Sequence, residues 1–309
     1  MTRSSAPRSI DEYLKQLRDA FAGEDPALVQ DALYDAEEYL RAEVAANAGK
    51  SEADVLELIA STYGAPDEVA TAYRDTEAKV KAALRPPAPK AAESPSALRR
   101  FFGVFSDARA YTSLFYMLLA LATGIVYFTF AVTGLAMSAG LAVMIIGIPF
   151  FLAFIGIARV ISLGEGRLLE AITGERMPRR PVHPGPRQKW WERIVDMLKD
   201  VRTWTTLAYF VLMMPLGIAY FVIAITGLSL GVSFIVGPFI EAAGALGWIH
   251  VDGGLDVDGM PMVGWVDSPV GLVLMFFAGI LILTLLMHVA RGIGRLHARM
   301  AKALLVTAL

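Results

Sequence analysis

Residues 107–135 read DARAYTSLFYMLLALATGIVYFTFAVTGL, and residues 200–228 read DVRTWTTLAYFVLMMPLGIAYFVIAITGL. The two stretches align without a gap at an offset of 93 residues, so that Gly124 corresponds to Gly217. After its opening Asp-x-Arg, each copy is uncharged and mostly apolar, and it is long enough to cross a hydrocarbon core of roughly 30 Å. The repeat therefore predicts a membrane domain built from two copies of one helical unit.

The composition agrees with a membrane protein. The chain of 309 residues is 55% hydrophobic, and its mean hydropathy is +0.51. It has no cysteine, which excludes a disulfide framework and thiolate ligands or nucleophiles. The four histidines are scattered, and His288 and His297, at or beyond the cytoplasmic end of the last span, are expected in the headgroup zone. We find no catalytic motif, and we expect no catalytic residue, metal site or cofactor.

Basic residues predict how the chain crosses the membrane. They cluster before the first apolar run, between the second and third, and after the last. By the positive-inside rule both termini and the middle loop are cytoplasmic, in a multi-pass protein of the bacterial inner membrane. The stretch 229–239 is expected to be short or re-entrant, because Gly237-Pro238 interrupts it and a fifth span would place the basic C-terminus outside. The expected spans are 112–135, 139–161, 204–228 and 269–290.

The segment 240–268 is predicted to be an extracytoplasmic insert. It contains acidic residues and no Lys or Arg, and Asp258-Gly259 suggests a small β-hairpin. Asp256 and Asp258 form a fragment of a calcium-loop pattern, but the later ligands are missing, so a solvated turn is favoured. The candidate ligand-binding residues of the insert are Trp248, Asp252, Asp256, Asp258, Trp265 and Asp267.

Residues 1–85 predict a small cytoplasmic helical domain, in which acidic residues outnumber basic ones. Asp25-Pro26 and Ser51 are typical helix starts. A proline- and alanine-rich linker, 86–98, joins this domain to two membrane repeats, 99–199 and 200–309. The expected fold is all-α, with four transmembrane helices arranged as an internal repeat. The expected helices of the domain are 9–22, 27–47, 52–63 and 67–84, and further helices at the membrane surface are expected at 97–109 and 188–200.

One helix of this domain carries a cluster of acids. Asp35, Glu37, Glu38 and Glu43 lie close together with only Arg41 among them. This cluster is either a solvated face, or a docking face for a basic partner or for the loop 176–189 of the same chain. If the acids are only a solvated surface, the apolar residues Leu58, Ile59 and Tyr63 become the better docking candidates.

Residues 34–75 resemble the bacterial HAAS-type domain, which is related to DUF1700. The shared features are the acidic-aromatic second helix, the Gly-Lys-Ser-Glu helix start at 49–52, and Gly-x-Pro-x-Glu-Val-Ala at 64–70. The residue before this last motif is Tyr63, in place of the more usual Leu. The resemblance implies a signalling role, because domains of this type commonly precede membrane segments in proteins encoded beside PadR-like repressors.

Residues 107–305 resemble the sensor membrane domain found ahead of bacterial histidine kinases. The resemblance is carried by Asp200-x-Arg202-x-Trp204, by the Pro-Leu-Gly-Ile-Ala-Tyr-Phe run at 215–221, by the Gly-Pro step at 237–238, and by Ala290-Arg291 after the last span. We expect no kinase activity, because no phosphotransfer helix or ATP-binding domain follows.

These features predict a non-enzymatic membrane sensor or signal-transduction adaptor that passes a membrane or envelope signal to a cytoplasmic regulator, such as a PadR-like protein. The expected partners are the lipid bilayer, this regulator and a second copy of the chain, without direct nucleic acid binding. The alternative is a lipid- or small-solute-handling membrane protein with a regulatory cytoplasmic domain.

Overall fold

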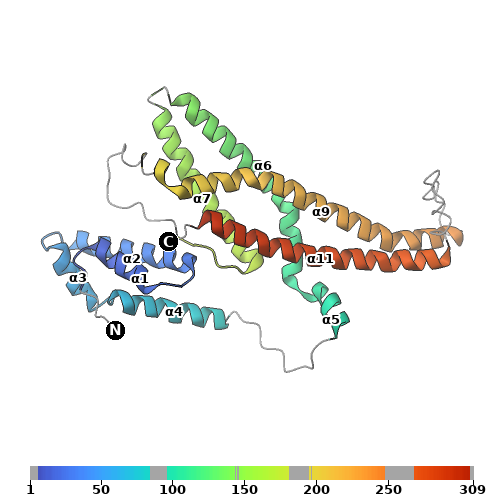
Figure 1. Ribbon diagram of the computed structural model, residues 1–309, viewed down its shortest axis with the longest axis horizontal. Helices are drawn as coiled ribbons and strands as arrows, with labels where there is room; N and C mark the ends of the chain where they lie inside the picture. Colours follow the sequence, from blue (N-terminus) through green and yellow to red (C-terminus); the bar gives the residue numbers. More distant parts are fainter. Residues whose placement is uncertain are drawn as a thin grey trace. The chain divides into compact units, whose positions relative to one another are not determined.

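The computed structural model describes residues 6–83, 96–142, 144, 146–180, 195, 197–247 and 268–306 (Figure 1). Every regular element in these ranges is a helix, which confirms the predicted all-α class. The chain forms two compact units. One consists of Met1–Glu93, Met137–Leu207 and Met300–Leu309, and the other of Ser94–Ala136 and Ala208–Arg299.

The N-terminal helical domain begins the first unit. Its four helices are α1 (Ile10–Ala20), α2 (Pro26–Ala46), α3 (Glu52–Ala60) and α4 (Pro66–Ala83), close to the predicted segments. The side chains of Ser9, Asp25 and Ser51 accept backbone N–H bonds at the starts of the first three helices. Gly64 precedes α4 with a φ of 104°, a conformation that favours glycine.

The core of this domain is formed by one face of each helix. Leu17 of α1, Leu40 of α2 and Val55 of α3 are all fully buried. The Tyr13 hydroxyl donates a hydrogen bond of 2.8 Å to the carbonyl oxygen of Gly64, which joins α1 to the turn before α4. Because all four helices contribute to one cluster, the domain provides a rigid platform for the charged side chains on α2 and α4.

Four further helices are long and apolar enough to cross a membrane. They are α6 (Ala108–Leu141), α7 (Gly147–Thr173), α9 (Val201–Ala245) and α11 (Pro269–Leu305). At 1.5 Å per residue each is longer than a hydrocarbon core of roughly 30 Å, so their ends extend beyond it. Before α6 the chain forms the short helix α5 (Ala97–Phe102) and the 3₁₀ helix η1 (Gly103–Ser106), at the first of the two predicted surface helices.

Two sequence predictions about these helices were wrong. The stretch 229–239 is not a short or re-entrant piece, because α9 continues through Pro238 to Ala245. The proline lacks one backbone N–H donor, but this loss does not end the helix. The turn between the first two membrane helices also lies later than predicted, because the predicted spans 112–135 and 139–161 place it before residue 139. The α6 helix ends at Leu141. A Cβ on Gly147 would lie 2.1 Å from the Leu141 carbonyl oxygen, so this turn requires glycine.

The helices α6 and α9 cross in backbone contact (Figure 1). A Cβ on Gly124 would lie 2.5 Å from the carbonyl oxygen of Met213, and a Cβ on Gly217 would lie 2.3 Å from that of Ala120. These four residues are two matched pairs of the sequence repeat, since each pair is separated by 93 positions. Each copy therefore contributes one glycine to the crossing. One turn before that glycine, its backbone contacts the glycine of the other copy.

The helices α9 and α11 form an antiparallel pair in the second unit. Gly227 of α9 faces Leu286 of α11, and farther along α9 the side chain of Ile235 faces Gly279. Small residues at these positions let the two helices approach closely, as is typical of helix packing in membranes.

We predict that Gly124→Ala and Gly217→Ala each destabilise the protein by about 1–3 kcal/mol, because the added methyl group meets a backbone carbonyl that has no room to move. Gly156→Ala is the matched control, since a Cβ at this exposed position of α7 meets nothing within 4 Å. The measurement is thermal unfolding of the full chain in detergent. Equal stability of all three variants would contradict the close crossing.

Candidate functional site

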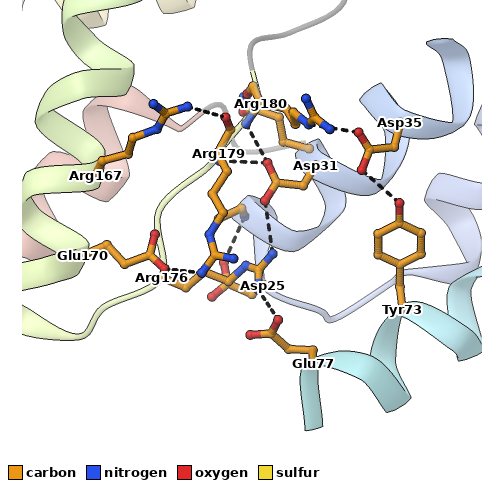
Figure 2. Close-up of polar contacts among 12 residues, drawn as sticks. Asp25, Asp31, Asp35, Tyr73, Glu77, Arg167, Glu170, Arg176, Arg179 and Arg180 are labelled. Atoms are coloured by element: carbon orange, nitrogen blue, oxygen red, sulfur yellow. Dashed lines mark hydrogen bonds and ion pairs between the residues drawn. The ribbon is translucent and has the colours of Figure 1, made fainter. Parts of the chain in front are cut away.

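Three acidic residues on the N-terminal domain form the candidate site, which we call the acidic surface. Asp31 and Asp35 are four positions apart on α2 and therefore lie on the same side of that helix. Glu77 of α4 is joined to Asp31 through Arg176, which pairs with both carboxylates (Figure 2). Asp31 is only 6% exposed, which is unusual for a carboxylate unless it is paired.

The partner of this surface is the segment 174–180, which directly follows α7. The α7 helix ends at Gly174, whose φ of 72° turns the chain away from the helix axis. Met177 is then buried beside Gly166 of α7, so the segment packs back on the helix that precedes it. Arg176, Arg179 and Arg180 are thereby presented to α2 and α4 (Figure 2).

Asp31 is the central acceptor of the contact. Its Oδ1 accepts hydrogen bonds of 2.9 Å from the backbone N–H groups of both Arg179 and Arg180. Its Oδ2 accepts one of 3.1 Å from the Arg176 guanidinium, which also pairs with Glu77. One carboxylate therefore binds both the backbone and a side chain of the segment, and such charged hydrogen bonds are the stronger ones.

Further contacts hold Arg180. Its guanidinium lies 3.0 Å from Asp35 Oδ1 and over the ring of Tyr34, at 5.7 Å from the ring centre. The Tyr73 hydroxyl of α4 donates to the other oxygen of Asp35 at 3.1 Å, which fixes the orientation of this carboxylate. The Gln30 amide donates to the Arg180 carbonyl oxygen at 2.6 Å.

The starts and ends of the long helices also reach this domain. Lys302, near the end of α11, lies 2.8 Å from Asp25 Oδ2 and 3.2 Å from Glu175. The other oxygen of Asp25 caps α2, so this residue joins the start of α2 to α11. Arg202, in the first turn of α9, donates to the Gln30 side-chain oxygen at 3.0 Å.

Burial and charge shift the pKa in opposite directions at Asp31 and Arg179, and in the same direction at Tyr73. Burial raises the pKa of the Asp31 carboxyl above its usual value, although the bonds from Arg180, Arg179 and Arg176 act to lower it. The hydrogen bond that the Arg179 guanidinium donates to Glu170 raises the pKa of this guanidinium. Burial, followed by the nearby Asp35 carboxylate, raises the pKa of the Tyr73 hydroxyl. Tyr73 therefore stays protonated as a donor.

The predicted docking residues differ in their contacts and in their exposure. Asp35 belongs to the acidic surface, whereas Glu37 pairs with Arg41 of its own helix at 2.7 Å and Glu38 is exposed. Leu58 is 53% exposed, but Ile59 is 3% exposed and lies in the core, so it is not a surface contact. Tyr63 stacks on Tyr39 with ring centres 4.4 Å apart. Docking of a partner at Glu37, Glu38 and Leu58 stays a prediction.

The candidate residues of the extracytoplasmic insert lie outside the described residues. This holds for all six of them, from Trp248 to Asp267, and for the predicted hairpin at Asp258-Gly259. The second predicted surface helix, 188–200, also falls largely on residues outside the described ranges.

Two ion pairs link the membrane repeats in a crossed manner. Asp107, before α6, accepts the N–H of Arg109 at 3.0 Å and lies 2.9 Å from Arg291 of α11. Asp200, before α9, accepts the N–H of Arg202 at 3.0 Å and lies 2.9 Å from Arg159 of α7. The first acid of each copy thus pairs with the arginine near the predicted end of the second span of the other copy.

The crossed pairing changes the acidity of Asp107. Burial alone would raise the pKa of Asp107, but the bonds from Arg291 and from the Arg109 N–H outweigh burial and lower it. Asp107 is therefore ionised at neutral pH, as its pairing with Arg291 requires.

One histidine is enclosed by other side chains of its own unit. His297 is 1% exposed within the second unit, and its expected place in the headgroup zone stays a prediction. Its ring nitrogens lie 2.8 Å from the Tyr116 hydroxyl, 3.1 Å from that of Tyr209 and 3.3 Å from that of Tyr220. Tyr116 and Tyr209 are matched positions of the repeat, which is the one sequence signal that pointed to this cluster.

The fold and composition of the four long helices define a multi-pass membrane protein. Residues 116–305 match the model of the family described as "Putative sensor", and the chain therefore belongs to this family. Comparisons with curated proteins and with solved structures find no significant match.

We predict that Asp31→Asn loosens the segment 174–180, because two backbone N–H groups and Arg176 lose their charged acceptor. Trypsin cleavage of the full chain after Arg176 and Arg179 should accelerate at least tenfold, since a charged hydrogen bond contributes about 1.5–3 kcal/mol. Glu38→Gln, on the same helix, is the control and should leave the cleavage rate unchanged. The acidic surface is not the anchor if both variants are cleaved at the wild-type rate.

Proposed function

We propose that the chain is a non-catalytic signal-transduction protein of the bacterial inner membrane, and that its N-terminal domain is the output. The insert before α11 or the lipid around the spans receives the signal, and the helical domain passes it to a cytoplasmic regulator. Membership of a sensor family supports the sensing part of this proposal. The four-helix arrangement supports the HAAS-like assignment of the N-terminal domain.

One observation carries the proposal. The α11 helix begins at Pro269, directly after the predicted insert, and ends in the turn where Lys302 binds Asp25. Asp25 caps α2, the helix that bears Asp31 and Asp35. A shift or rotation of α11 would therefore act on the first turn of α2 without any intermediate loop, which is a direct mechanical route from one side of the membrane to the output domain.

The acidic surface provides the second input to the same helix. Asp31 holds the segment that follows α7, and Lys302 holds the start of α2, so α2 responds to two membrane helices at once. A change in the spacing of α7 and α11 would break one contact or the other and release the N-terminal domain. The backbone contact of α6 and α9 at Gly124 and Gly217 favours this packed arrangement over a transport pathway.

The proposed orientation is tested by labelling from outside. The chain has no cysteine, so Asp258→Cys and His183→Cys each introduce a single reactive thiol. In intact cells, a membrane-impermeant maleimide should label the protein at 258 and not at 183, whereas both should react after permeabilisation. Labelling at 183 alone in intact cells would reverse the proposed topology.

The output role is tested with the full chain in nanodiscs exposed to cytoplasmic extract. We expect a transcriptional regulator or another signalling protein to be retained, and its amount to change in Lys302→Gln, which uncouples α11 from α2. Lys79→Gln is the matched control, because Lys79 is exposed on α4. Unchanged retention in Lys302→Gln would remove α11 from the route, and lipid or solute transport without any retained protein would support the alternative function.

A further inference from the structure

The short helix α5 is fastened to α11 on one side. The ring of Phe101 stacks on His288 with centres 5.4 Å apart, and a ring nitrogen of His288 lies 2.9 Å from the Phe101 carbonyl oxygen. Val104 of η1 is 1% exposed and packs with Ala110 and Met287. These contacts fix which face of α5 points away from the helices of its unit.

That outward face is apolar at two positions. Leu98 is 70% exposed and Phe102 is 42% exposed, and their spacing of four places them one above the other on α5. Large apolar side chains so exposed require a partner, and the helix that follows one residue after η1 is a membrane span. A lipid surface is therefore the partner nearest to this face.

The other sides of the same helix carry unbalanced positive charge. Arg99 and Arg100 are exposed, and no ion pair joins either of them to an acid within the ranges that the structure describes. Asp107, the acid nearest in sequence, pairs with Arg291. Within six positions the helix thus has apolar residues on one side and arginines on the others, as in helices that lie in the membrane interface.

We infer that α5 and η1 form a binding site for anionic phospholipids. Leu98 and Phe102 enter the boundary of the acyl chains, while Arg99 and Arg100 bind the headgroup phosphates. Each arginine close to an anionic surface strengthens binding roughly fivefold. The inference does not depend on the proposed signalling role, because it concerns only the contacts of α5 with lipid.

The first measurement places α5 relative to the bilayer. Leu98→Cys in the full chain carries a single spin label, and its collisions with oxygen and with a water-soluble nickel complex are compared in vesicles. In vesicles containing phosphatidylglycerol the label should be accessible to oxygen and shielded from nickel. A label that is freely accessible to nickel in these vesicles would overturn the proposal.

The second measurement tests the charge preference. Spin-labelled phosphatidylglycerol should associate with the full chain more strongly than spin-labelled phosphatidylcholine, and R99Q/R100Q should lower this preference by roughly fivefold for each arginine. The control K15Q/R18Q removes the same charge from exposed positions of α1 and should have no effect. An unchanged preference in R99Q/R100Q would overturn the assignment of the headgroup site.

Discussion

The absence of water in the hydrocarbon core determines most of this structure. Each backbone N–H and C=O there must be bonded within its own helix, so apolar sequence becomes long helix even where proline is present. The α9 helix contains both Pro215 and Pro238 and still runs from Val201 to Ala245. Asp107 and Asp200, which make ion pairs, directly precede long helices, and Lys302 makes its ion pairs near the end of α11.

The elements of the fold were largely predictable from local signals. Asp25-Pro26 and Ser51 start helices where the sequence predicted them, because capping depends on neighbouring residues only. The four long apolar runs likewise predicted four helices. The end of α9 was not predictable in this way, since a proline within a run usually ends a helix, whereas α9 continues through Pro238 to Ala245.

The candidate site was predicted only in part. The sequence placed an acidic face on α2, and the loop after α7 was one of its expected partners, but the acids that make the contact are mainly Asp31 and Glu77 rather than Glu37 and Glu38. The choice depends on which side of α2 faces the core, and an acid flanked by Gln30 and Ala32 gives no sign of its own burial. His297 was missed for the same reason, because its tyrosine partners are far away in sequence.

The crossed pairing of Asp107 with Arg291 and of Asp200 with Arg159 has a consequence for how such a chain is assembled. In each of these two pairs one half supplies the acid and the other half the arginine, so neither pair can form within one half. Made as two separate polypeptides, each half would leave one aspartate and one arginine of these pairs without their partners until the two halves met. Two copies of a single repeat would form both ion pairs as a symmetric dimer. Joining two such repeats in one chain preserves the contacts of that dimer within one molecule.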